Sequence, residues 1–118
     1  MDEETRRALC RVIAGIVVAD ARLDAREERF LNRLLARFGI DGEVTDCLTP
    51  IMEAAEAAEE LRGMAWTVQE QALRLLVEAA AVDREYATEE RAYLHAVAEV
   101  LGVSTDEVDR QVDAILRR

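Results

Sequence analysis

Apolar residues recur along this chain at the three- and four-residue spacing of an amphipathic helix and never alternate as in a strand. The first apolar stripe falls in a helix expected from about Glu3 to Asp20, and its members are Leu9, Ile13, Ile16 and Val17. A second helix is expected to begin near Asp24, because Asp24 and Glu27 have the spacing of a capping box. Gly39 suits the left-handed position that ends a helix. The pattern therefore predicts an all-α protein.

The remaining helices are predicted from capping signals and glycines. We expect them at about Glu43 to Leu48, from Thr49-Pro50 to about Arg62, from Thr67 to about Asp83, from Thr88 to Leu101, and from Ser104 to the C-terminus. Thr49 and Pro50 fit an N-cap followed by proline in the first turn. Thr67 opens a second capping-box spacing with Glu70, so the indole of Trp66 is expected to pack at this helix start.

The chain repeats itself without a gap at an offset of 63 residues, over about residues 7–40 and 70–103. Identical residues at this offset are Arg11 and Arg74, Asp20 and Asp83, Glu27 and Glu90, Leu31 and Leu94, and Gly39 and Gly102. Two copies are too few for a solenoid, and no linker divides the chain. We therefore expect a single domain over residues 1–118. It should be a compact helical bundle of two pseudo-repeated helix hairpins plus short connecting helices.

Charge and composition exclude several classes of function. The chain has 25 acidic residues against 15 arginines and no lysine, for a net charge of −10, so a nucleic-acid backbone would be repelled. With one serine, Ser104, and one histidine, His95, nucleophilic triads, Schiff bases and a P-loop are excluded. Ser104 has the spacing of a capping box with Glu107, and His95 is interpreted as an ordinary helix residue. We expect a protein that is not an enzyme; a carboxylate pair acting as general acid and base is the enzymatic alternative.

Nothing in the sequence predicts secretion or membrane insertion. The chain begins Met1-Asp2-Glu3-Glu4 without a basic and apolar leader, and no apolar run approaches the roughly 18 residues of a membrane span. Cys10 and Cys47 lack the spacing of a metal or redox motif and are interpreted as reduced thiols. A cytoplasmic location is therefore expected.

Four repeated carboxylates are expected to point into the hairpins. Each aspartate falls one heptad after an apolar position and each glutamate four residues before one, and the four residues are Asp20, Glu27, Asp83 and Glu90. Either they hydrogen-bond loop and helix-start N–H groups, or they converge on a hard divalent cation such as Ca²⁺ or Mg²⁺. Neither loop has the glycine or the bidentate glutamate of an EF-hand.

The segments Val18–Glu27 and Ala81–Glu90 resemble the duplicated A-D-G-x-x-x-x-x-E signature of the tellurite-resistance TerB family, which includes the N-terminal domain of the DjlA co-chaperones. The resemblance implies an all-helical bundle, a bacterial cytoplasmic protein linked to tellurite or other chemical stress, and a divalent-metal site. Its ligands would be Asp20, Glu27, Asp83 and Glu90. The glycine after each aspartate is replaced by Ala21 and Arg84, which changes the turn, and Arg84 could neutralise a neighbouring carboxylate.

Two hypotheses of function follow. The first is a TerB-like domain that binds a cation or a partner through its acidic side. The second is a helical protein–protein interaction or oligomerisation module, like an adaptor or co-chaperone and without metal. Two charged helix faces motivate the second: Glu53, Glu56, Glu59 and Glu60 on the middle helix, and Arg26, Arg29, Arg33 and Arg37 on the second helix.

Overall fold

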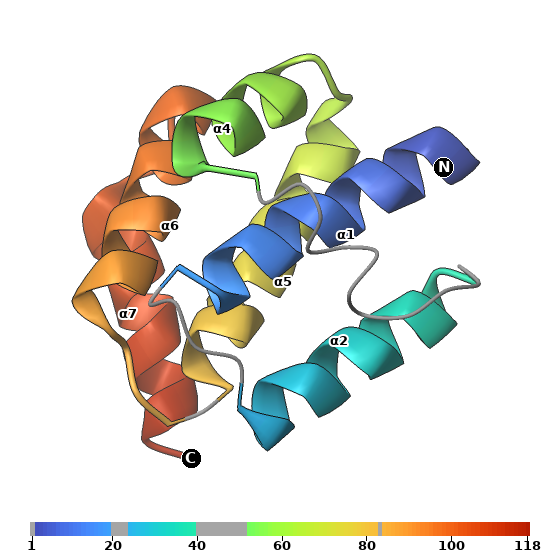
Figure 1. Ribbon diagram of the computed structural model, residues 1–118. Coiled ribbons are helices and arrows are strands. Elements are labelled where there is room, and N and C mark those ends of the chain that lie inside the picture. The colour runs from blue at the N-terminus through green and yellow to red at the C-terminus, as the bar shows by residue number, and fades with distance from the viewer. Residues whose placement is uncertain (1, 20–23, 40–51, 83) are drawn as a thin grey trace.

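The computed structural model describes residues 2–19, 24–39, 52–82 and 84–118, and these ranges contain six α-helices and no strand. The helices are α1 (Glu3–Val17), α2 (Ala25–Arg37), α4 (Ala54–Arg62), α5 (Trp66–Ala81), α6 (Thr88–Leu101) and α7 (Thr105–Leu116), as Figure 1 shows. The predicted all-α helical bundle is confirmed. Within the described ranges, no helix has both the length and the apolar character needed to cross a membrane. The helix predicted at about Glu43 to Leu48 lies outside the described residues.

Helix α1 forms the centre of the bundle. It packs against α2, α4, α5 and α6, and Figure 1 shows it running between α2 and α6. Nine of its fifteen residues are buried, which is why its sequence is apolar on more than one face. The predicted stripe members are completely or almost completely buried: Leu9, Ile13, Ile16 and Val17.

The helices of the two sequence repeats pack together in pairs, α1 with α2 and α5 with α6. Helix α2 begins at Ala25 and α6 at Thr88, which is the 63-residue offset of the sequence repeat. Gly39 and Gly102 follow the two helices with φ of 66° and 75°. A glycine adopts this left-handed backbone without strain, so both predicted helix ends are confirmed.

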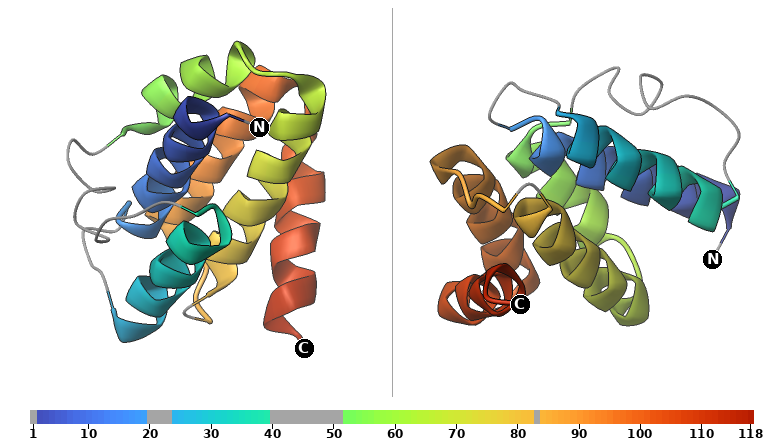
Figure 2. Two further views of the ribbon diagram at one scale, coloured as in Figure 1. Left: turned by 90° about the vertical axis from the view of Figure 1, so that its right-hand side faces the viewer. Right: turned by 90° about the horizontal axis from the view of Figure 1, so that it is seen from below.

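Helix α7 covers the outer side of the second pair. It packs against α5 and α6 and buries Val108 and Val112 completely, and Figure 2 shows it at the edge of the bundle, away from α2. As predicted, Ser104 is its N-cap, and the Ser104 hydroxyl accepts a hydrogen bond from the N–H of Glu107 at 3.4 Å.

The first and fifth helices end earlier than the sequence predicts. Helix α1 ends at Val17 instead of about Asp20, and α5 ends at Ala81 instead of about Asp83. The orientation predicted for Asp20 and Asp83 assumed that each helix continues to its aspartate. Both helices end before that residue. Those two aspartates lie outside the described residues, so their inward orientation stays a prediction.

Helix α4 begins at Ala54, and the predicted start at Thr49-Pro50 is wrong, because the two residues before Ala54 are described and are not helical. The Met52 side chain is buried, and the Met52 carbonyl accepts a hydrogen bond from the Tyr93 hydroxyl of α6 at 3.2 Å. A contact with a distant helix thus holds the segment before α4 in an extended form. Capping signals near the helix could not reveal it.

Gly15 allows this contact because it has no side chain. The Tyr93 hydroxyl lies over Gly15 in α1 and also donates toward the Val12 carbonyl at 3.0 Å. A Cβ at Gly15 would lie 2.5 Å from the Met52 carbonyl oxygen and 3.0 Å from Cζ of Tyr93. Burial raises the pKa of the Tyr93 hydroxyl above its usual value, which keeps the proton on this donor. Helices α1 and α6 and the start of α4 therefore meet at one hydroxyl.

Helix α5 begins at Trp66, and the predicted capping box at Thr67 is wrong. Its N-cap is Ala65, which has no side-chain oxygen. Instead, the Gln69 side chain donates to the Leu61 carbonyl at 2.9 Å and so caps the end of the preceding helix α4. The α4–α5 corner is therefore fixed by a hydrogen bond between two helices.

Candidate functional site

The start of α2 is a complete capping box, as predicted. The Asp24 carboxylate accepts a hydrogen bond from the N–H of Glu27 at 2.9 Å, and Oε1 of Glu27 accepts one from the N–H of Asp24 at 3.1 Å. Glu27 is only 1 % exposed and stands four residues before the buried Leu31. Its carboxylate therefore points into the hairpin while it satisfies the helix start.

The start of α6 repeats half of this arrangement. Oε1 of Glu90 accepts a hydrogen bond from the N–H of Ala87 at 3.1 Å, the same distance as in α2. The reciprocal bond is missing because Ala87, at the N-cap, has no side-chain acceptor. Glu90 is 0 % exposed, and it stands four residues before the buried Leu94. The two repeated glutamates thus have the same position, the same burial and the same hydrogen bond.

Glu27 and Glu90 are the two buried charged side chains of the described part of the chain. The two helices that carry them, α2 and α6, both pack against α1. Across residues 2–19, 24–39, 52–82 and 84–118, no group of three or more histidine, cysteine, aspartate or glutamate side chains is placed to hold a metal ion. The other two predicted ligands, Asp20 and Asp83, lie outside these ranges.

Arg84, which replaces the second glycine of the TerB-like signature, has a φ of 68°. It is the one residue other than glycine with a positive φ in the described ranges. For an L-residue this left-handed conformation costs about 1–2 kcal/mol relative to the right-handed region. The backbone at this position therefore has the conformation that a glycine favours, although the side chain is that of arginine.

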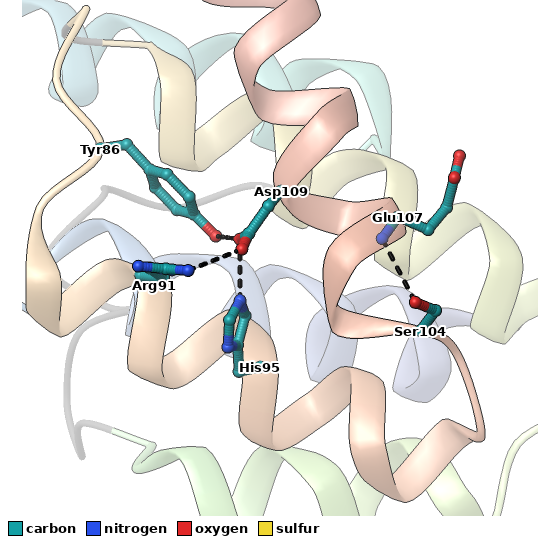
Figure 3. Close-up of polar contacts among 6 residues, drawn as sticks. All are labelled: Tyr86, Arg91, His95, Ser104, Glu107 and Asp109. Carbon is teal, nitrogen blue, oxygen red and sulfur yellow. Dashed lines mark hydrogen bonds and ion pairs between the residues drawn. The ribbon is translucent and has the colours of Figure 1, made fainter.

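A polar cluster that the sequence analysis missed joins α6 to α7. Three groups from α6 and the segment before it converge on the Asp109 carboxylate of α7, as Figure 3 shows. The Tyr86 hydroxyl donates at 2.8 Å, the Arg91 guanidinium at 3.0 Å, and Nε2 of His95 lies at 2.7 Å. The Asp109 side chain is 19 % exposed and that of His95 is 25 % exposed, so water reaches both.

These contacts change the acidity of two groups. Partial burial raises the pKa of Asp109, but the hydrogen bonds from His95, Tyr86 and Arg91 outweigh it, and the net effect lowers this pKa below its usual value. Burial and the hydrogen bond to Asp109 raise the pKa of the Tyr86 hydroxyl. Asp109 is therefore an anion over the neutral range, and it holds α7 against α6. The cluster thus links α7 to α6 and to the segment before it.

The sequence contains little signal for this cluster. His95 and Asp109 are 14 residues apart, and Tyr86 and Asp109 are 23 apart, so no motif of short spacing connects them. Asp109 lies next to Val108, on the border of the buried face of α7. The side chains of α6 that Asp109 contacts are set by the packing angle between α6 and α7.

Trp66 is 56 % exposed, so the expectation that its indole packs at the helix start is wrong. On α5 it lies roughly opposite the buried face, which carries Ala72, Leu75 and Ala79. The indole borders a hollow of about 240 Å³, whose apolar lining comes from Leu73, Leu101 and Val103.

Both charged faces noted in the sequence are exposed. The acidic residues are the N-cap Glu53 and, on α4, Glu56, Glu59 and Glu60; on α2 the residues are Arg26, Arg29, Arg33 and Arg37. Helices α2 and α4 each pack against α1, which separates them in Figure 1. The two faces therefore do not complement each other within one copy of the chain.

Comparisons of the chain with protein-family models, with curated proteins and with solved structures found no match.

Proposed function

We propose that this chain is a non-enzymatic, cytoplasmic TerB-like domain of a bacterial response to tellurite or other chemical stress. In this proposal it binds a divalent cation, Ca²⁺ or Mg²⁺, through Asp20, Glu27, Asp83 and Glu90. The observation that supports it most directly is the equivalence of Glu27 and Glu90. Both are buried, and both occupy the third position of their helix, at the end of each TerB-like signature.

The position of the glutamates suits a cation site in part. Burial of a carboxylate costs free energy unless hydrogen bonds or a cation compensate the charge. One N–H donor serves Oε1 of each glutamate at 3.1 Å. A hard cation prefers carboxylate oxygens, and an aspartate stands seven residues before each glutamate to supply further ones.

Thermal unfolding with and without cations tests this proposal. The wild-type chain is compared in EDTA and in excess Ca²⁺, Mg²⁺ or Mn²⁺, beside a variant that carries Asp20→Asn and Asp83→Asn. A ligand at 100 times its dissociation constant adds about 2.7 kcal/mol to the free energy of unfolding. The midpoint of a domain of this size should then rise by several degrees.

A matched control carries Asp106→Asn and Asp113→Asn, which remove the same charge from exposed positions of α7. We expect the control to keep the cation-dependent shift and the Asp20/Asp83 variant to lose it. If no cation shifts the wild type and the Asp20/Asp83 variant is merely less stable, the carboxylates build the turns and cation binding is refuted. A shift that persists in the variant would place the site elsewhere.

The second candidate function is a helical interaction or oligomerisation module without metal. The observation that favours it is the exposure of two helix faces of opposite charge on the same chain, on α2 and on α4. A cation titration without effect would leave this candidate intact, because it needs neither Glu27 nor Glu90.

A further inference from the structure

Two rows of exposed side chains with opposite charge run along α2 and α4. The arginine face consists of Arg29, Arg33 and Arg37, and the acidic face of Glu53, Glu56 and Glu60. With about 100° of rotation per residue, each row spans no more than roughly 80° of its helix. Each face is therefore a narrow charged stripe along one side of a helix.

These six side chains differ from other surface charges in how they are paired. Other surface charges have a polar partner: Arg62 pairs with Glu59 at 3.3 Å, and Arg7 pairs with Glu3 at 3.0 Å. Across the described ranges, the side chains of the arginine face and of the acidic face form neither a hydrogen bond nor an ion pair. In a chain of net charge −10, the arginine face is thus a local cationic stripe.

The two faces cannot reach each other inside one molecule. Helix α1 lies between α2 and α4 and packs against both, and the left view of Figure 2 shows α2 and α4 apart from each other. Exposed rows that are complementary in charge but lie on different sides of a molecule fit a head-to-tail contact between copies.

We propose that the acidic face of one copy docks on the arginine face of a second copy, so that the chain associates head to tail. This inference deepens the second candidate function and is independent of cation binding. A contact of this kind is heterologous and leaves one free face of each charge at the ends of an assembly, unless a ring closes.

The surface beside the arginine face offers apolar area to an incoming helix. Arg33 and Arg37 border a hollow of about 270 Å³ between α2 and α5, and its apolar lining comes from Phe30, Leu34 and Leu75. Glu78 stands on the α5 side of this hollow. An acidic helix is therefore repelled from the α5 side and directed toward α2, where it would cover the half-buried Phe30 ring.

The dependence on salt follows from the charges. Each copy has a net charge of −10, so at low ionic strength, where the Debye length is about 30 Å at 0.01 M, whole molecules repel each other. At about 0.15 M salt the Debye length falls to about 8 Å, which screens the repulsion between whole molecules but not the contact between the two faces. At about 1 M salt the Debye length is about 3 Å, and the contact between the two faces is weakened as well. Association should therefore be strongest at intermediate salt.

Sedimentation or light scattering of the full chain tests this inference. The weight-average mass is followed with protein concentration up to about 1 mM, since small charged contacts of this kind are weak. Variant A carries Arg29→Glu and Arg33→Glu, and variant B carries Glu56→Arg and Glu60→Arg. All four positions are exposed, so we expect both variants to keep the helical content and melting behaviour of the wild type.

We expect the wild-type mass to rise above the monomer mass of 13.2 kDa at intermediate salt and to return toward it at about 1 M salt. Variants A and B should each stay monomeric, because each then has two faces of like charge. An equal mixture of A and B should associate again, since the α4 of variant A keeps its glutamates and the α2 of variant B keeps its arginines. The matched control, Arg117→Glu with Arg118→Glu on the exposed C-terminus, has the net charge of variant A and should associate like the wild type.

Three results would overturn the inference: a wild type that is monomeric at every salt and concentration, a variant A or B that associates as the wild type does, or a mixture that remains monomeric. Loss of association in the Arg117/Arg118 control would attribute the effect to net charge and would also overturn it. None of these outcomes depends on a cation, so a failure here and a failure of cation binding can be told apart.

Discussion

Replacement of Gly15 by alanine should destabilise the protein, although alanine is the better helix former. In an unobstructed helix interior, Gly→Ala contributes up to about 1 kcal/mol in favour of folding. Here the new Cβ would overlap the Tyr93 hydroxyl and would lie 2.5 Å from the Met52 carbonyl oxygen. A carbonyl of the backbone cannot swing away as the end of a flexible side chain can. Forcing extra volume into a packed interior costs about 1–3 kcal/mol.

The hydrogen bonds of Tyr93 add to this cost. If the hydroxyl is displaced, its bonds to the Val12 and Met52 carbonyls, at 3.0 Å and 3.2 Å, are weakened together. One such bond contributes about 0.5–1.5 kcal/mol. Set against the helix propensity, the net loss in the free energy of unfolding is about 1–3 kcal/mol, or about 4–12 °C in the melting temperature. Thermal and urea unfolding followed by circular dichroism measure it.

Gly63, at the end of α4, provides a matched control. Its φ is −79°, and a Cβ there would meet only the Glu60 carbonyl at an ordinary 3.9 Å. We expect Gly63→Ala to stabilise the protein by about 0.4–1 kcal/mol, since it restricts the unfolded chain. The combination of Gly15→Ala with Tyr93→Phe should cost less than the two single changes together. If Gly15→Ala stabilised the protein as Gly63→Ala does, the close approach of Tyr93 to α1 would be refuted.

Two further predictions concern the helix starts and the link between α6 and α7. Asp24→Ala should lower the free energy of unfolding by about 0.5–2 kcal/mol because the Glu27 N–H loses its acceptor, whereas Asp24→Asn should cost much less; urea unfolding distinguishes them. Asp109→Asn should destabilise the protein at neutral pH by about 1–2 kcal/mol, because three hydrogen bonds lose a charged acceptor. Since folding lowers the pKa of Asp109, its contribution is present above the unfolded value of about 4 and is lost as the pH falls through the lower folded value. The difference between wild type and Asp109→Asn should therefore shrink below about pH 4, and a difference that stays constant down to pH 2 would contradict this assignment.

The burial of two of the four predicted cation ligands follows from the sequence. Glu27 and Glu90 each stand four residues before a core leucine, and that spacing alone predicts their burial, which the structure confirms. For Asp20 and Asp83 the same reasoning needed α1 and α5 to continue, but the helices end at Val17 and Ala81. The residue at which a helix ends depends on what its last turn packs against. Beyond that residue, the helical rotation no longer predicts where a side chain points.

The class of fold, the equivalent starts of α2 and α6, and the glycines that end these two helices all follow from the amino-acid sequence. Each depends on hydrogen bonds or backbone angles within about four residues, and amino-acid type controls these directly. By contrast, the start of α4, the residues around Asp109 and the reason for a glycine at position 15 are evident only in the packed helices. These features join residues that are between 14 and 81 positions apart. Such contacts depend on how helices cross, and the crossing is set by the whole core and not by any one segment.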